Sequence, residues 1–159
     1  MNISDEVLRN LRKIIRAIDL YSKKMVNNYG LTGSQALLMR ELLVASEQLS
    51  VSVLSQRISL SHATVTDILN RLHSKGLVQR ERDVKDKRRI MVELSEKGKS
   101  LISAVPSLLQ EDFLSRFGNL KEWEQMSILA NLQRVASLMD AHNLDASPVL
   151  TSESIGASV

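Results

Sequence analysis

The sequence of 159 residues contains no cysteine and only two prolines. Without cysteine the chain cannot form disulfides, thiolate nucleophiles or cysteine-ligated zinc sites. Its three histidines, His62, His73 and His142, do not share the spacing of metal ligands. We therefore expect neither a metal nor a cofactor.

Aromatic residues and long apolar runs are also scarce. Phe, Trp and Tyr make up 3% of the sequence, so the core has to be built from aliphatic side chains and methionine. No apolar run is long enough to span a bilayer and no signal peptide is recognisable, so we expect a cytoplasmic protein. A nucleophile–base pair, a metal-ligand set and a glycine-rich phosphate loop are all missing, which argues against an enzyme.

The positive charge is concentrated in one short stretch. The formal net charge of the whole chain is +3. Residues 80–89 hold six basic and three acidic side chains, so this short stretch alone has a net charge of +3. Such a concentration favours contact with a polyanion over a uniformly solvated surface.

Residues 61–76 predict a helix with two different faces. Ser61 is a good N-cap and Gly76 suits the left-handed position after the last turn. Apolar residues recur at helical spacing on one side, at Val65, Ile68, Leu69 and Leu72. The other side is short-chained and polar, and two interpretations remain open for it. It is either the solvated side of a core helix or a face that contacts the edges of DNA bases.

The segments around this helix predict a winged helix-turn-helix over residues 32–94. Thr32 and Gln35 form a capping box before a helix that runs to about residue 46. Residues 47–52 are a polar connector, and Ser52 begins a short helix over 53–58 that a tight turn joins to the next. Alternating residues over 78–82 and 90–94 predict two strands, with the basic stretch at the hairpin tip.

The remaining segments predict long amphipathic helices over 4–29, 95–117 and 120–142. Ser4 is a plausible N-cap, Pro106 should kink or end the second helix, and Asn119 with Glu122 forms an N-terminal box for the third. Residues 143–159 have no periodicity and predict a flexible tail. The fold class is therefore mainly α with a small β-wing.

The apolar stripes of these terminal helices are too long for the winged unit to cover. Because soluble proteins avoid large exposed apolar patches, we expect 4–29 and 95–142 to form a homodimer interface. The expected interface residues are Val7, Leu11, Ile14, Ile15, Trp123, Leu129, Leu132, Val135 and Met139.

Two stretches carry a family resemblance. LSHATVTDILNRLHSKGLV (60–78), followed by DVKDKRRIMVELSEKG (83–98), resembles the MarR family of bacterial transcription regulators. The most specific part is the Asp-Lys-Arg segment before the second strand, joined to a Leu-Ser-x-x-Gly helix start. Over residues 5–142 the resemblance implies a homodimeric regulator, often a repressor, that binds a pseudo-palindromic DNA operator.

The resemblance also implies roles for individual residues. The helix over 61–76 would enter the major groove, and Arg88 matches the wing arginine that enters the minor groove, with Asp86 as the acidic residue before it. Base contacts would come from the helix and phosphate contacts from Arg57, Lys75, Lys85 and Lys87. The expected DNA-binding residues are Arg57, Ser61, His62, Ala63, Thr64, Thr66, Asn70, Arg71, Lys75, Lys85, Asp86, Lys87 and Arg88.

Many members of this family respond to small, often aromatic, ligands bound between the dimerisation helices and the winged unit. Tyr21, Met25, Tyr29 and Met39 could line such a pocket, or could be ordinary core residues. Residues 11–23 and 30–35 also resemble a subgroup that controls compatible-solute genes in osmotic stress. A quaternary ammonium effector of that kind would call for an aromatic cage.

One alternative from another class remains, a helical adaptor that does not bind DNA. It would explain the long helices but not the charge of residues 80–89. Salt-insensitive DNA affinity would favour it, because phosphate contacts release counterions.

Overall fold

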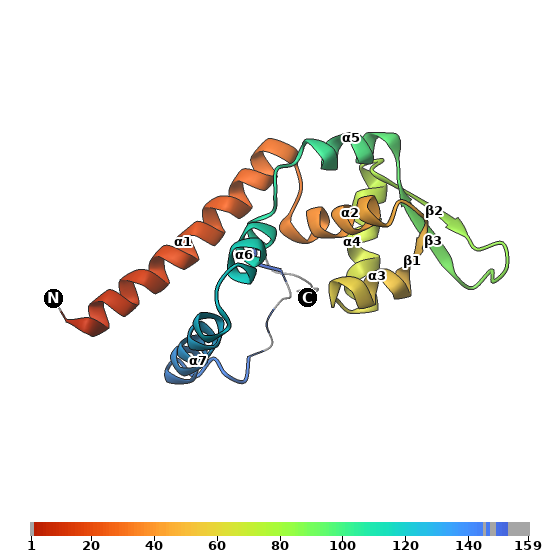
Figure 1. Cartoon of the computed structure of the whole chain (residues 1–159). Helices are drawn as coiled ribbons and strands as arrows, with labels where there is room; N and C mark the ends of the chain where they lie inside the picture. Colours follow the sequence, from red (N-terminus) through yellow and green to blue (C-terminus); the bar gives the residue numbers. More distant parts are fainter. Residues whose placement is uncertain (1, 145, 147–148, 153–159) are drawn as a thin grey trace.

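The computed structural model describes residues 2–144, 146 and 149–152, and Figure 1 shows its elements in two groups. A compact lobe holds α2 to α5 and the strands, while α1 and α7 extend away from it. The bounds are α1 Ile3–Tyr29, α2 Gly33–Ala45, β1 Leu49–Ser50, α3 Val51–Ile58, α4 His62–Ser74, β2 Val78–Arg82, β3 Ile90–Leu94, α5 Glu96–Ala104, α6 Leu109–Gly118 and α7 Glu122–Leu138. This is the predicted fold class, mainly helical with a small wing.

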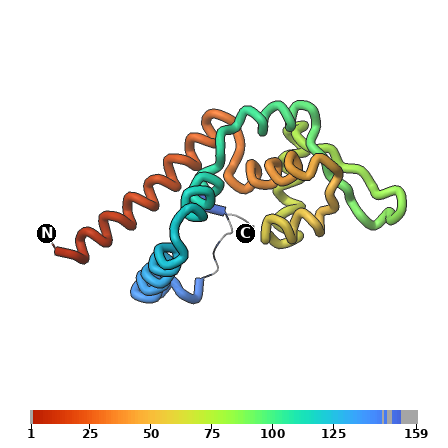
Figure 2. Tube along the Cα trace, in the orientation of Figure 1, coloured from red at the N-terminus to blue at the C-terminus, as the bar shows by residue number. Residues whose placement is uncertain are grey.

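The compact lobe is a winged helix-turn-helix with an aliphatic core. Leu38, Leu54, Leu69 and Leu72 are fully buried there, on α2, α3 and α4. The sheet has the order β1-β3-β2 and is antiparallel throughout. Val78 pairs with Leu94 at the core end and Arg82 with Ile90 at the far end, so the hairpin projects outward (Figure 2).

The predicted helix over 61–76 is confirmed as α4. The Ser61 hydroxyl accepts from the Thr64 backbone N–H at 3.1 Å, and Gly76 has a φ of 70°. Val65, Ile68, Leu69 and Leu72 are the buried residues of the helix. The apolar stripe of α4 is buried against the core, so the opposite, polar face of the helix turns outward.

A junction of α4, the wing and α5 explains the Leu-Ser-x-x-Gly pattern. Ser95 caps α5 by accepting from the Gly98 N–H at 3.0 Å, and its own N–H donates to the Leu77 carbonyl at 3.0 Å. Its hydroxyl donates to the Gly76 carbonyl at 2.6 Å. A Cβ added at Gly98 would collide with the Leu77 carbonyl oxygen, so only glycine allows this approach.

The segment predicted as a helix over 95–117 is divided at Pro106, one of the two outcomes expected of that proline. α5 ends at Ala104, Pro106 lies in the connector, and α6 starts at Leu109. The residue before a proline is disfavoured in helical conformation, and Val105 is indeed extended. Ile102, Val105 and Leu108 belong to the same buried core cluster as the apolar residues of α2, α3 and α4.

Several helix starts also differ from the prediction. α1 is capped by Asn2 in place of Ser4, and α3 by Ser50 in place of Ser52. The expected connector 47–52 contains β1, which pairs with β3. At α7 the Glu124 carboxylate accepts from the Lys121 N–H at 3.0 Å, so the predicted Asn119–Glu122 box does not form.

The terminal helices expose apolar side chains within one chain. No residue of α6 or α7 is buried, and Ile15 and Trp123 are 65% and 67% exposed. Of the expected interface residues, Leu11 and Val135 are half-buried and the others are exposed. None of the helices in the described part of the chain has the length and apolar character needed to cross a bilayer.

Residues 149–152 were expected to belong to a flexible tail, but they lie against the body of the protein. Val149 is buried, and the Ser152 N–H donates to the Ser22 hydroxyl of α1 at 3.0 Å. Residues 145, 147–148 and 153–159 of the expected tail lie outside the described residues.

The junction predicts a specific stability defect. Gly98→Ala should lower the free energy of unfolding by about 1–3 kcal/mol, because the added methyl group forces apart α5 and the Leu77 carbonyl. Urea denaturation followed by circular dichroism measures the change. Gly118→Ala is the matched control, since a Cβ there meets nothing within 4 Å. An equal loss at both positions would contradict the steric explanation.

Candidate nucleic-acid interface

The outward face of α4 presents small polar groups without a cover of long side chains. Ser61, His62, Ala63 and Asn70 are exposed, and Thr64 and Thr66 are half-buried. Part of their hydrogen-bonding capacity is used locally: the Thr66 hydroxyl donates to the His62 carbonyl at 2.9 Å. A helix of this width with short side chains can approach the floor of a DNA major groove closely.

Two acidic residues shape the basic tip of the wing. The Asp83 carboxylate accepts from the Lys85 N–H at 2.9 Å, and the Asp86 carboxylate accepts from the Arg88 N–H at 3.0 Å. Such Asx turns hold the backbone in a fixed curve. Asp86, expected among the DNA-binding residues, thus positions Arg88 through its backbone, and Lys85, Lys87 and Arg88 are exposed around it.

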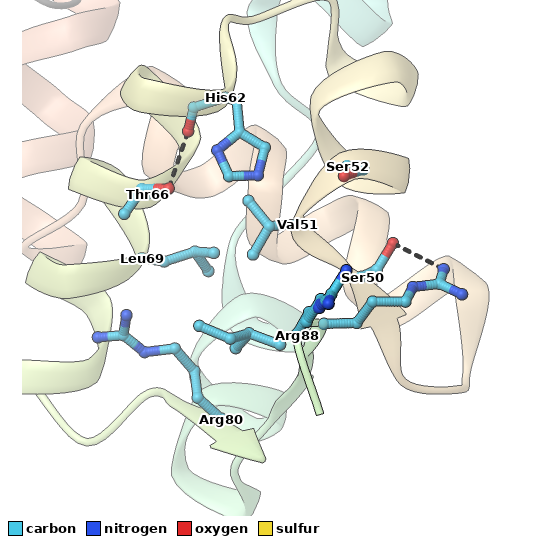
Figure 3. A pocket seen from close by; sticks show the side chains of 10 residues that line it. Ser50, Val51, Ser52, His62, Thr66, Leu69, Arg80 and Arg88 are labelled. Carbon is cyan, nitrogen blue, oxygen red and sulfur yellow. Dashed lines mark hydrogen bonds between the residues drawn. The ribbon is translucent and has the colours of Figure 1, made fainter. Parts of the chain in front are cut away.

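A cleft of about 250 Å³ lies between α3, α4 and the wing (Figure 3). In this view His62 and Thr66 come from α4, Ser50 and Ser52 from the start of α3, and Arg88 from the wing. Arg80 and Arg89 also line the cleft, and the Arg89 guanidinium donates to the Ser50 hydroxyl at 3.4 Å. Three guanidinium groups around one cleft make it strongly attractive to an anion such as a DNA phosphate.

One side chain from the wing holds a residue of α4 directly. The Arg80 guanidinium donates to the Asn70 amide oxygen at 2.8 Å. This bond links strand β2 to the outward face of α4, and it orients the Asn70 amide. The wing and the helix are therefore joined at their exposed surfaces as well as through the core.

The other expected contact residues already have partners within the chain, and these partners differ in how strongly they hold them. Arg71 pairs with Asp67 at 3.2 Å, and both are well exposed, so water screens the pair. Arg57 pairs with Glu41 at 3.1 Å. The Lys75 ammonium donates to the Gly30 carbonyl at 2.7 Å, so it satisfies the end of α1 and a phosphate contact would have to break that bond.

The expected ligand-pocket residues do not all face a cavity. Met25 and Met39 are 1% and 0% exposed and belong to the core, and Tyr29 packs against it. For the two methionines core packing, the alternative left open by the sequence, is what the structure shows. Tyr21 lines a small cleft of about 80 Å³ together with Leu37, Leu108 and Val149.

Sequence reasoning missed four polar residues of the cleft, Ser50, Ser52, Arg80 and Arg89. The two arginines lie in the basic stretch whose charge was noticed, but charge alone does not say which way a long side chain points. The only signal for the direction of a side chain was the strand register, in which Arg80 pairs with Val92 across the hairpin. Among the described residues no cluster of three metal-ligand side chains was found.

Comparison with known sequences finds a match over most of the winged unit. Residues 29–89 match the profile of the MarR family. The HTH-type transcriptional regulator SarZ of Staphylococcus aureus is 33% identical over 91 residues, which are 57% of this chain and 60% of that protein. The chain thus spans about 60% of the length of the curated relatives it matches. The names of these relatives are those of transcription regulators, not of enzymes.

Solved structures share the fold over most of the chain. A MepR–DNA complex from S. aureus has a TM-score of 0.61 at 23% identity, covering 82% of this chain and 96% of that one. A mutant MarR from E. coli, complexed with operator DNA, has a TM-score of 0.56 at 21% identity, covering 85% and 99%. BldR from Sulfolobus solfataricus has a TM-score of 0.55 at 22% identity, covering 87% and 99%. At these identities the likeness shows the winged helix architecture.

The wing geometry predicts a local effect of Asp86. Asp86→Ala should speed hydrogen exchange of the Arg88 amide by about 5-fold or more, because the amide loses its acceptor and the turn opens. Amide exchange followed by NMR measures the rate. Asp86→Asn keeps an acceptor oxygen and removes the charge, so it should stay close to the parent. Equal exchange in all three proteins would contradict the positioning role.

Proposed function

We propose that this chain is a MarR-family transcription regulator that binds an operator as a homodimer, with α4 in the major groove and the β2–β3 wing in the adjacent minor groove. The observation that carries the proposal is the single cleft that the face of α4, the start of α3 and the wing arginines surround. Base-reading groups and phosphate-binding groups thus converge on one side of the winged unit.

The roles divide by chemistry. Side chains at the N-terminal end of α4, from Ser61 to Thr66, are mostly short. They let the helix come close enough to the floor of the major groove to contact base edges. Lys85 and Lys87 carry point charges on the wing and suit phosphates, while Arg88 suits a narrow minor groove with its enhanced negative potential. Arg80 and Arg89 add phosphate contacts along the edge of the cleft, and Arg57 adds one from α3.

The homodimer is supported by the exposed apolar faces of α1, α6 and α7. One chain leaves Ile14, Ile15, Leu129 and Leu132 about half exposed or more. Patches of this kind are normally buried against a partner. A two-fold axis among these helices would present two α4 helices to successive major grooves about 34–36 Å apart, so the operator should be a pseudo-palindrome.

The direction of control and its effector are further parts of the proposal. By resemblance we propose repression that a small molecule relieves, and an osmotic-stress role in compatible-solute genes. A quaternary ammonium effector would need an aromatic cage. Among the described residues the one stacked ring pair is Phe113–Phe117, with centroids 5.3 Å apart. Titration of glycine betaine and of salicylate into the DNA complex distinguishes the two effector classes.

The central experiment is selection of duplexes from a random-sequence library by the purified chain. A pseudo-palindromic consensus with half-sites one helical turn apart supports the proposal. The competing adaptor function predicts no enrichment and an affinity that does not change with salt concentration.

The wing arginine gives a direct test. Arg88→Ala should weaken binding of the selected duplex by about 1–3 kcal/mol, because a minor-groove contact is lost. Gel-shift titration measures the affinity, and gel filtration verifies that the variant assembles like the parent. Arg9→Ala removes an equal charge on α1, where Arg9 pairs with Glu6, and should bind like the parent. Parent-like affinity for Arg88→Ala would contradict a role for the wing.

The dimer gives a second test. Leu132→Asp, on the exposed apolar face of α7, should shift the protein to a monomer, because the interface would bury an unpaired charge. Analytical ultracentrifugation measures the mass. Val44→Asp is the matched control, since Val44 is 71% exposed on α2. A Leu132→Asp dimer as stable as the parent would place the interface elsewhere.

A further inference from the structure

Residues 149–152 lie in a groove between α1, α2 and α6. Figure 1 and Figure 2 show this blue segment beside α6, far along the chain from the helices it contacts. Val149 is only 7% exposed and lines the groove with Tyr21, Leu37, Leu108 and Leu114. An apolar side chain from the end of the chain thus completes an apolar surface that the helices leave open.

Polar contacts fix the segment at three points. The Leu150 N–H donates to the Gln110 amide oxygen of α6 at 3.1 Å. The Ser152 N–H donates to the Ser22 hydroxyl of α1 at 3.0 Å, and the same hydroxyl lies 3.3 Å from the Thr151 hydroxyl. Ser22 is itself 2% exposed. The groove therefore satisfies backbone donors of the segment as well as its apolar side chain.

Gly33 forms the floor of the groove at the start of α2. A Cβ added there would lie 3.2 Å from the Thr151 Cβ and 3.5 Å from a Val149 methyl carbon. The absence of a side chain at this position makes room for the segment. Three separate features, a buried valine, paired backbone donors and a glycine floor, thus fit the same four residues.

We propose that residues 149–152 are a removable intrachain tie, whose docking in this groove holds the winged unit against the terminal helices and raises the affinity for DNA. The tie joins α2, the first helix of the winged unit, to α1 and α6, which carry the proposed dimer interface. Its regulatory effect rests on the proposed function, whereas the docking itself does not.

The physical basis is conformational freedom. Two α4 helices must keep a fixed separation to enter successive grooves, and any hinge between α2 and α6 widens the range of separations. A docked segment removes part of that freedom before DNA binds, so less has to be lost on binding. Release of the segment should therefore weaken the complex. Arg40 of α2 contributes a second tie, because it pairs with Glu111 of α6 at 3.2 Å.

Docking is tested with a disulfide, since the chain has no cysteine of its own. The Gly33→Cys/Thr151→Cys variant should form an intrachain disulfide in most of its molecules under mild oxidation. A Cβ at position 33 would lie 3.2 Å from the Thr151 Cβ, so a shift of a few tenths of an ångström brings the pair to the separation of about 3.5–4.5 Å found in disulfides. Gly118→Cys/Thr151→Cys is the matched control and should not cross-link within the chain. Mass spectrometry and a non-reducing gel distinguish the products. A missing disulfide, or one between two chains, would overturn intrachain docking.

The effect on DNA is tested by release of the segment. Val149→Asp should weaken binding of the selected duplex by roughly 2- to 30-fold, the range expected for a residue that couples two parts without touching the ligand. Leu144→Asp, at a side chain that is 72% exposed, is the matched control and should bind like the parent. The oxidised double-cysteine variant should bind at least as tightly as its reduced form.

The outcomes separate the two proposals. If the disulfide forms and Val149→Asp binds DNA like the parent, the segment docks but does not act on DNA, which overturns the tie. Tighter binding by Val149→Asp would overturn it as well. If the parent chain enriches no duplex, the proposed function fails, while the disulfide still decides whether the segment docks.

Discussion

The approach of α5 to the Leu77 carbonyl sets the geometry on which the proposed DNA-binding surface depends. Leu77 lies between the end of α4 and the start of β2, and Ser95 lies between β3 and α5. The hydrogen bonds from Ser95 to Gly76 and Leu77 therefore join both ends of the hairpin to the end of α4. Since the hairpin is rigid only as a paired unit, this junction fixes the angle between the wing and α4. That angle decides whether a helix and a hairpin can follow neighbouring grooves of one duplex.

Local patterns predicted most of the winged unit because its elements obey local rules. The Ser61 cap, the α4 stripe and the alternation in β2 and β3 each point to one conformation, and the core agrees with all three. The errors arise where tertiary packing decides. Nothing local says that Val105 and Leu108 belong to the same core as the helices of the winged unit, since that core forms only in the folded chain. The docking of Val149 is of the same kind, because four residues without periodicity give no signal of a groove built by three distant helices.

The sequence marks the charged region of the wing but not the directions of its side chains. The charge of residues 80–89 marked the wing, but the directions of its side chains follow from the turn and from partners elsewhere. Asp86 bends the backbone, Arg80 reaches Asn70, and Arg89 reaches Ser50 of another element. Conversely, Lys75 is basic and adjacent to α4, yet it bonds the end of α1. A long cationic side chain has many rotamers of similar energy, so its role is set by the nearest acceptor.

The Arg80–Asn70 hydrogen bond has a consequence for how operators diverge. Arg80 occupies part of the acceptor capacity of the Asn70 amide oxygen, so the two N–H donors become the larger share of what this amide can still offer to a base. Donors of this kind match the N7 and O6 acceptors of guanine or the O4 of thymine, and match less well the mixed donor and acceptor pattern of adenine. In the proposed complex, the preferred base opposite Asn70 would then depend on two residues, Asn70 on α4 and Arg80 on β2. In related regulators with this arrangement, a change at the strand position should alter the preferred base even where the helix is identical.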